Sequence, residues 1–320
     1  MTERNYDPQL AEIIGLLPTT VEWGPPESMV EMRAGAMAWQ PPVEPCADVV
    51  REDRTVPGRA GDPDVGIRIY RPIDAPDAPM PGVFEIHGGG FITGNLEMMD
   101  GWCDIVAAEF PAVVVSVDYR LAPEDPFPAG VEDCYAALAW FADHADELGV
   151  DPTRIAIAGQ SAGGGLAAGT ALLARDRGGP ALCFQLLDIP ELDDRLETPS
   201  MQQFTDTPLW NRPNAIRSWS WYLGSDDAPG SDDVSYYAAP SRCEDLRGLP
   251  AAFVAVMEFD PLRDEGIVYA MRLLEAGIST ELHAYPGTFH GSSLVGEADV
   301  SKRHGRDALG ALRRAVGADS

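Results

Sequence analysis

Residues 154–175 read RIAIAGQSAGGGLAAGTALLAR, and this stretch decides the fold. The apolar run Arg154–Ala158 is typical of a buried strand, and Ala162–Arg175, rich in alanine and leucine, is typical of a helix. Between them, Gly159-Gln160-Ser161-Ala162-Gly163 matches G-x-S-x-G, a sharp strand-to-helix turn that lifts a serine hydroxyl out of the end of a sheet. The stretch therefore predicts an α/β fold in which Ser161 is a candidate nucleophile.

A second motif, His87-Gly88-Gly89-Gly90-Phe91, lies upstream of this turn. A G-x-S-x-G match is a weak signal alone, because the chain has 32 Gly among its 320 residues. Histidine followed by three glycines is rarer, since 5 His and 32 Gly predict about 0.005 chance matches. The backbone N–H groups of such a loop complete an oxyanion hole, which binds the oxygen of a carbonyl under attack. Together the two motifs predict chemistry at an acyl carbonyl.

Strand and helix patterns alternate along most of the chain, which predicts a mostly parallel sheet with helices on both faces. The predicted strands are Val65–Tyr70, Gly82–Ile86, Val113–Val117, Arg154–Ala158, Leu182–Leu187, Ala251–Met257 and Glu281–Tyr285. The predicted helices are Pro8–Leu17, Glu27–Trp39, Met98–Phe110, Glu132–Leu148, Ala162–Ala174, Asp264–Ala276 and Lys302–Val316.

Two segments do not fit this alternation, residues 1–45 and about 190–230. We expect them to form a helical cap over the carboxyl ends of the strands, where ligands bind in such sheets. No linker divides the chain, so residues 1–320 are expected to form a single domain with its cap. The aromatic side chains of the second segment suit either a substrate pocket or packing of cap on core, and the sequence leaves both open. They are Trp210, Trp219, Trp221 and Tyr222.

Composition excludes several classes of protein. The net charge is −28, and the single lysine is Lys302, so no basic surface is expected for nucleic acid or an anionic membrane. No apolar run reaches ~18 residues, and the N-terminus lacks a signal-peptide pattern, which favours a cytoplasmic protein. The five scattered cysteines are expected to be reduced thiols.

A serine nucleophile needs a histidine base and a carboxylate that orients it, in the chain order Ser, Asp or Glu, His. Three histidines follow Ser161. His283 lies within a strand pattern and His304 within a helix pattern, whereas His290 lies in a glycine-bounded loop after the last strand. His290 is therefore the predicted base. Two carboxylates, Glu258 and Asp260, follow the preceding strand, and the turn at Asp260-Pro261 favours Asp260.

The chain resembles the hormone-sensitive lipase group of α/β-hydrolases, which includes bacterial esterases. The similarity rests on the two motifs above and on three further stretches: Asp118-Tyr119-Arg120-Leu121-Ala122-Pro123-Glu124, Asp260-Pro261-Leu262-Arg263-Asp264-Glu265-Gly266 and the His290 loop. The resemblance implies an α/β-hydrolase fold with an eight-stranded sheet. It implies Ser161 as nucleophile, Asp260 as acid and His290 as base. The implied oxyanion donors are the backbone N–H groups of Gly89, Gly90 and Ala162, with Gly88 shaping the loop.

The chain departs from the group at two positions. Gln160 stands where many members have Asp or Glu, and Ser292 follows His290-Gly291 where an apolar residue is also found. Neither position belongs to the catalytic set, so hydrolysis is still expected.

The resemblance implies a serine carboxylesterase that acts on small-molecule esters with short acyl groups, acetyl being favoured, and with bulky alcohols. An amidase or lactonase on the same catalytic residues is the alternative, and a ligand receptor without activity is a weaker one. No nucleotide motif is present, so no cofactor is expected. Dimers are common among similar proteins, which makes a homodimer one expectation for the assembly.

Two polar clusters lie outside these motifs. Glu191, Asp193, Asp194 and Glu197 have no neighbouring His or Cys, so a solvated acidic face is expected and no metal site. Arg120 is expected to brace the glycine loop through an ion pair with a carboxylate, and a surface turn before a helix is the alternative for this segment.

Overall fold

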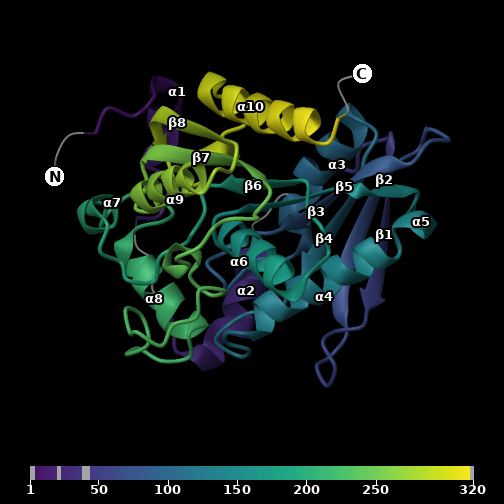
Figure 1. Cartoon of the computed structure of the whole chain (residues 1–320). Helices are drawn as coiled ribbons and strands as arrows, with labels where there is room; N and C mark the ends of the chain where they lie inside the picture. The colour runs from purple at the N-terminus through teal and green to yellow at the C-terminus, as the bar shows by residue number, and fades with distance from the viewer. Residues whose placement is uncertain (1–3, 20–22, 38–43, 318–320) are drawn as a thin grey trace.

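A single sheet forms the centre of the protein, in a computed structural model that describes residues 4–19, 23–37 and 44–317. The strand order is β1-β2-β4-β3-β5-β6-β7-β8 (Figure 1). β1 pairs with β2 and β2 with β4 in antiparallel fashion, and the other pairs are parallel. The strands are Val49–Val56, Val65–Pro72, Met80–Ile86, Val113–Asp118, Val150–Gln160, Phe184–Asp188, Ala251–Phe259 and Thr280–Phe289. The predicted α/β-hydrolase architecture is thereby confirmed.

Helices cover both faces of the sheet (Figure 1). One face packs against α3 (Asp100–Glu109) and α10 (Asp299–Ala315). The other packs against α4 (Ala129–Asp143), α6 (Ala162–Arg177) and α9 (Arg263–Glu275), with α5 (Ala145–Leu148) after α4. Consecutive strand residues point to opposite faces, so Val83 joins the first core and Phe84 the second. Burial on both faces explains why the central strands are continuous apolar runs.

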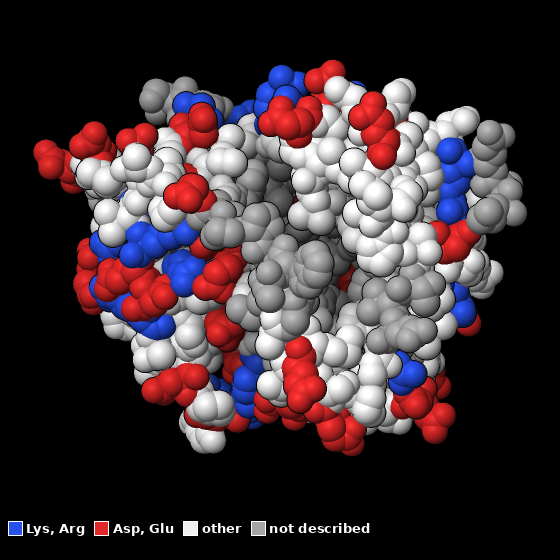
Figure 2. Space-filling view, turned by 180° about the vertical axis from the view of Figure 1, so that it is seen from behind, with Lys and Arg blue, Asp and Glu red and all other residues white. Residues whose placement is uncertain are grey.

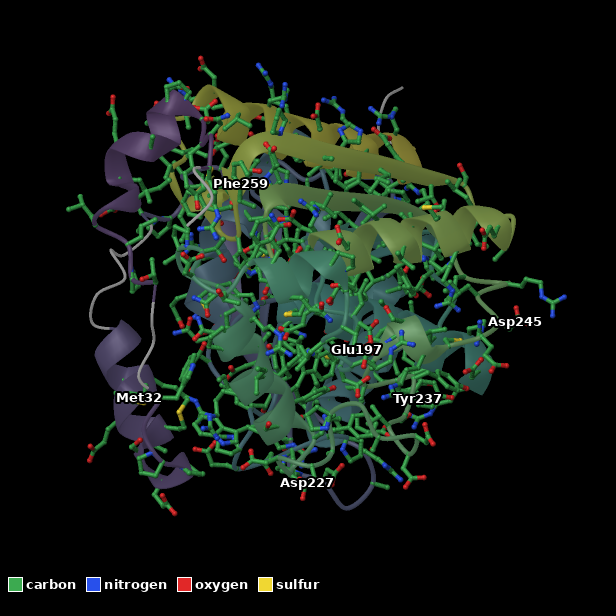
Figure 3. All side chains as sticks on the ribbon, turned by 90° about the vertical axis from the view of Figure 1, so that its left-hand side faces the viewer. Met32, Glu197, Asp227, Tyr237, Asp245 and Phe259 are labelled. Atoms are coloured by element: carbon green, nitrogen blue, oxygen red, sulfur yellow. The ribbon has the colours of Figure 1, made fainter. Side chains whose placement is uncertain are left out.

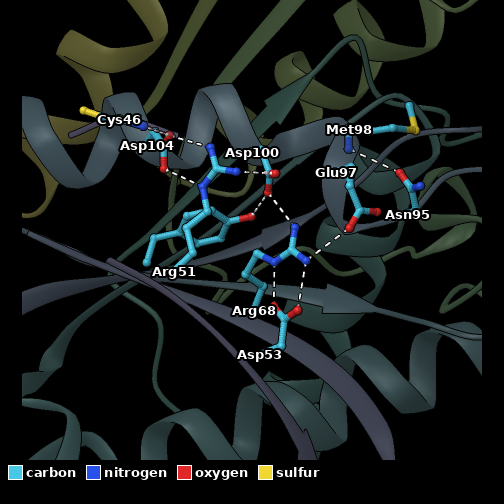
Figure 4. A network of polar contacts seen from close by, with 10 residues as sticks. Cys46, Arg51, Asp53, Arg68, Asn95, Glu97, Met98, Asp100 and Asp104 are labelled. Atoms are coloured by element: carbon cyan, nitrogen blue, oxygen red, sulfur yellow. Dashed lines mark hydrogen bonds and ion pairs between the residues drawn. The ribbon is translucent and has the colours of Figure 1, made fainter. Parts of the chain in front are cut away.

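The edge strand β1 was missed by the sequence prediction. Its residues Arg51–Arg54 are all charged, so no apolar alternation marks it as a strand. In the structure, Arg51 donates to Asp104 and Asp100 of α3, each at 2.6 Å, and Arg68 of β2 donates to Asp100 at 3.0 Å (Figure 4). β1 is held by backbone pairing to β2 and by this ion-pair network, neither of which leaves a periodic hydrophobic signal.

The N-terminal segment runs along one side of the molecule (Figure 3). Its helix α1 (Pro8–Ile14) lies beside β8 and α10, where the Asp7 N–H donates to the Gly287 carbonyl at 2.9 Å (Figure 1). Before α2 (Met29–Met37), the segment reaches the region of α7 (Pro199–Gln203) and α8 (Arg212–Tyr222). The Trp23 indole donates to Asn214 of α8 at 3.1 Å. The predicted helix 8–17 ends at Ile14, and the predicted helix 27–39 reaches beyond Met37 into residues outside the described part of the chain.

Charge is spread widely over the surface. In Figure 2, acidic side chains and interspersed arginines lie mainly around the rim of the face, and the described residues around its central hollow are mostly uncharged. All five cysteines are free thiols. Among the described residues, no helix has the length and apolar character that a bilayer crossing requires.

Candidate active site

The turn between β5 and α6 carries Ser161 in a strained backbone conformation. Its φ is 58° and its ψ is −120°, a region that non-glycine residues seldom occupy. The flanking glycines make this turn sterically possible. A Cβ on Gly159 would lie 2.2 Å from the carbonyl oxygen of Gly163, and a Cβ on Gly163 would lie 2.1 Å from that of Ile86. The glycines of the motif are therefore required by close backbone packing.

Ser161, His290 and Asp260, predicted from separate loops, lie in one hydrogen-bonded chain. Ser161 Oγ is 2.8 Å from His290 Nε2, and His290 Nδ1 is 2.8 Å from Asp260 Oδ2. All three side chains are buried. The other oxygen of Asp260 accepts from the backbone N–H of Leu262 at 2.9 Å, which fixes the carboxylate. The Nδ1 proton directed at Asp260 leaves Nε2 free to accept from the serine hydroxyl.

The competing residues lie elsewhere. Glu258 accepts from the backbone N–H of Gly287 at 2.6 Å, so it supports the loop that precedes His290. The His283 ring contacts Glu281 at 2.7 Å. His304, which the sequence suggested to be structural or exposed, is buried and lies 2.8 Å from Asp188.

The glycine loop lies beside the serine turn. Gly89 has a φ of 117° and Gly90 a φ of 61°, both in the left-handed region that favours glycine. Gly88 packs against the turn itself, since its Cβ would lie 2.9 Å from the Gln160 carbonyl oxygen. No acceptor among the described residues takes the backbone N–H of Gly89, Gly90 or Ala162. These N–H groups have the character that an oxyanion hole requires.

The comparisons with known proteins agree with this arrangement. A family model described as alpha/beta hydrolase fold matches residues 83–294. The chain belongs to the α/β-hydrolase family. The hydrolase is 42% identical to esterase LipI of Mycobacterium tuberculosis over 296 residues, 92% of this chain and 89% of the relative. It is 36% identical to an arylesterase of Saccharolobus solfataricus, over 80% of this chain and 81% of that relative.

A solved structure titled Bacterial Heroin Esterase superimposes on the hydrolase with a TM-score of 0.92. The two chains are 52% identical, and the match covers 98% of each. These matches confirm the resemblance to the hormone-sensitive lipase group.

The residues that support the glycine loop differ from the prediction. Arg120 forms a bidentate pair with Asp133 of α4, at 2.8 and 2.7 Å, and does not contact the loop. Its neighbour Tyr119 stacks on the His87 ring at 4.3 Å and donates to the His87 carbonyl at 3.1 Å. Arg33 of α2 donates to the Ile92 carbonyl at 2.7 Å, just beyond the loop. Tyr119 and the N-terminal segment thus supply contacts to the loop region, and Arg120 forms its ion pair elsewhere.

His87 itself stays neutral. Its Nδ1 lies 2.7 Å from the Gly88 carbonyl oxygen, and burial lowers the pKa of the ring to about 4. A neutral ring in this position supports the loop conformation without adding charge beside Ser161.

Aromatic side chains of α8 and the preceding turn contact the glycine loop. The Trp210 ring is tilted over His290, with centroids 5.9 Å apart, and a Cβ on Gly90 would lie 2.5 Å from it. Tyr222 stacks on Phe91 at 4.0 Å, and Ser218 donates to the Gly90 carbonyl at 2.6 Å. The aromatic residues Trp210 and Tyr222 thus pack on the loop, and the Trp210 ring also borders His290.

The prediction of a solvated acidic face at residues 191–197 is wrong for three of its four members. Asp194 is buried and accepts two hydrogen bonds from the Arg242 guanidinium. Asp193 forms an ion pair with Arg195. Glu191 is fully buried, and burial together with the nearby charge of Asp260 raises its pKa well above the ordinary value. Glu197 alone is exposed. The segment turns inward after β6, which charge composition did not reveal.

Sequence reasoning also missed a polar link behind the serine turn. Gln160 Nε2 donates to Asp188 at 2.9 Å, and Asp188 is held on its other side by His304. The backbone N–H of Ser161 donates to the Asp188 carbonyl at 2.8 Å. Asp188 is the last residue of β6, the strand that pairs with β5. Its position at the end of a predicted strand could have indicated from the sequence that it lies near Ser161.

Proposed function

We propose that this hydrolase is a serine carboxylesterase in which Ser161 attacks the ester carbonyl. The observation that carries the proposal is the hydrogen-bonded chain Ser161–His290–Asp260, with two contacts of 2.8 Å. Carboxylic ester hydrolysis is also the enzyme class of its relatives, among them carboxylesterase NlhH of Mycobacterium tuberculosis, which is 41% identical over 98% of this chain.

The reaction follows in two steps from this geometry. His290 takes the Ser161 proton as the oxygen attacks, and Asp260 stabilises the ring while it is charged. The backbone N–H groups of Gly89, Gly90 and Ala162 hold the oxyanion, with Gly88 shaping the loop. His290 then gives its proton to the leaving alcohol, and water hydrolyses the acyl-enzyme by the same route.

We assign short acyl esters, acetyl in particular, and bulky alcohols as the substrates. The support is the resemblance to the hormone-sensitive lipase group and the 52% identity to a protein named for heroin hydrolysis. We also propose that residues 1–45 and about 190–230 act as the cap of the single domain. Contacts of Trp210 and Ser218 with the glycine loop support a cap that borders the site.

The test is hydrolysis of p-nitrophenyl acetate, butyrate, octanoate and laurate. We expect turnover that falls with chain length, and a loss of about 10⁶-fold in kcat for Ser161→Ala, by analogy with other triad serines. The matched control is Ser116→Ala, because Ser116 is also a buried serine, on β4, and its hydroxyl has no hydrogen-bond partner among the described residues. Ester turnover that survives Ser161→Ala would overturn the proposal.

Amide hydrolysis is the second candidate. It is supported by a 31% identity to bovine arylacetamide deacetylase over 72% of each chain. Phenyl acetate and acetanilide present the same acyl group on oxygen and on nitrogen, so their kcat/KM ratio separates the two activities. We expect the ester to be favoured. A receptor without activity is not supported, because the three catalytic side chains are present and hydrogen-bonded to one another.

A further inference from the structure

A cavity of about 580 Å³ lies behind the serine turn, on the face of the sheet that α3 and α10 cover. It is bordered by Gln160, the residue before Ser161, and by Leu294, which follows the His290 loop. Its floor is formed by side chains of β3 and β6, among them Glu85 and Asp188. None of the residues predicted as nucleophile, acid, base or oxyanion loop lines it.

The walls of the cavity are mostly apolar, and one of them is formed by a single face of α10. On α10, Ser301, His304, Gly305 and Ala308 are spaced by three or four residues and so share one helix face. Around the opening, Met98, Ile105 and Leu294 are exposed hydrophobic side chains. An apolar molecule in this opening would cover surface that is now in contact with water.

The floor carries a buried carboxyl group without a cationic partner. Glu85 is 1% exposed, and it accepts hydrogen bonds from the Trp102 indole, at 3.0 Å, and from the backbone of Ile86. Among the described residues, no Lys, Arg or His forms an ion pair with Glu85, whereas the buried Asp100 and Asp194 each pair with arginine. Burial raises the pKa of Glu85 to about 8. A buried carboxylate that lacks a counterion is stabilised by a cation brought to it.

The other titratable groups of the cavity already satisfy one another. Asp188 and His304 form a buried pair at 2.8 Å, and Asp188 also accepts from Gln160. Glu85 is therefore the carboxyl group of the cavity that has no cationic partner among the described residues.

We propose that this cavity binds small molecules that combine a protonated amine with an apolar body. The ammonium group lies against Glu85, and the apolar part lies between α3 and α10, towards Met98 and Leu294. The net charge of −28 favours the approach of such cations. The site goes beyond the proposed hydrolysis, since it uses none of the catalytic side chains, and its occupancy is measured without turnover.

The experiment is isothermal titration calorimetry of the whole chain near pH 8, the pKa of Glu85. The probes are 2-phenylethylamine and its neutral analogue 2-phenylethanol. We expect the amine to bind at least about tenfold more tightly, the gain of a charge-assisted hydrogen bond. Glu85→Gln keeps the shape of the side chain and should weaken amine binding by about tenfold or more, while alcohol binding stays within about threefold.

A second variant blocks the cavity sterically. No heavy atom lies within 4 Å of a Cβ placed on Gly305, so Gly305→Leu can fill the space and also removes a glycine from a helix interior. We expect it to abolish binding of both probes. Gly310→Leu lies on the same helix outside the cavity and is the matched control, which should bind normally.

The proposal is overturned by any of three results. These are an amine that binds no more tightly than the alcohol, amine binding unchanged by Glu85→Gln, and binding that survives Gly305→Leu. The last result would place the amine elsewhere, for example at Ser161. Melting temperatures establish that all three variants are folded.

Discussion

The molecule contains two buried Asp–His pairs with the same contact distance and different surroundings. Asp260 follows β7, and His290 lies in the loop after β8, 2.8 Å away. Asp188 ends β6, and His304 lies on α10, also 2.8 Å away. The His290 ring contacts Asp260 through Nδ1 and Ser161 through Nε2. The His304 ring contacts Asp188 through Nε2, and Nδ1 has no hydrogen-bond partner among the described residues.

The difference leads us to propose different roles for the two Asp–His pairs. The His290 ring contacts a serine because its loop places the ring between Asp260, at the end of β7, and the turn that carries Ser161. The pair formed by Asp188 and His304 instead holds the turn from behind, through Gln160 and the Ser161 backbone N–H. We propose proton transfer as the role of the first pair and support of the serine turn as the role of the second.

Asp260→Asn breaks the first pair and should have the largest effect. An asparagine amide favours the wrong tautomer of His290, so we expect kcat to fall about 10⁴-fold while the fold is retained. The measurement is p-nitrophenyl acetate hydrolysis with circular dichroism of the variant. Near-normal turnover would remove Asp260 from the catalytic set.

Asp188→Asn breaks the second pair and should act on stability. Removing one partner of a buried ion pair costs about 3–5 kcal/mol of unfolding free energy, while kcat should stay within about tenfold of wild type. Urea titration and the same ester assay measure the two quantities. A fall in kcat as large as that of Asp260→Asn would mean that the two pairs are not functionally distinct.

Gln160→Glu sharpens the comparison, because it leaves both pairs in place and sets a like charge beside Asp188. The lost hydrogen bond and the repulsion should cost about 1–3 kcal/mol of unfolding free energy near neutral pH. Acidification that protonates the new carboxyl should restore part of this loss. If the loss of unfolding free energy were the same at neutral pH and after acidification, the electrostatic explanation would be contradicted. Gln160→Met, which removes the hydrogen bond without adding charge, is the control.

His304→Gln tests the charge of the second pair, with the smallest expected effect. Burial opposes the charged ring, but Asp188 outweighs it and raises the pKa of His304 above its ordinary value, while the pKa of Asp188 is lowered. The contribution of the charged His304 is therefore complete below its unfolded pKa of about 6.5 and is lost as the pH rises through the higher folded value.

The stability difference between wild type and His304→Gln should therefore be larger at about pH 5.5 than at about pH 9. Asp188 is ionised at both values because its pKa is lowered. Thermal melts at the two pH values measure this difference. A larger difference at the alkaline value would contradict the assignment of a charged His304.

Local sequence signals predicted residues that end strands or lie in glycine-bounded turns. Ser161, Asp260 and His290 each follow an apolar strand in a known chain order, and in the structure these three predicted residues lie within hydrogen-bonding distance of one another. The Asp188–His304 pair could not be selected in this way, because its members are 116 residues apart and only the packing of α10 on the sheet brings them together.

Two other features depended on tertiary contacts in the same way. Glu191 lies in an acidic stretch that resembles a surface loop, but the chain turns inward there and buries it. β1 has no apolar pattern, since its position depends on pairing to β2 and on arginine contacts to α3.

The polarity of β1 also has a consequence for crowded solutions. An edge strand presents unpaired backbone groups to which a strand of another molecule can add, the first step of sheet-mediated aggregation. Arg51-Glu52-Asp53-Arg54 places four consecutive charges on that strand, and an incoming strand would desolvate the exposed side chains of Glu52 and Asp53. The composition that hides β1 in the sequence is thus also one that disfavours the addition of a strand from another molecule.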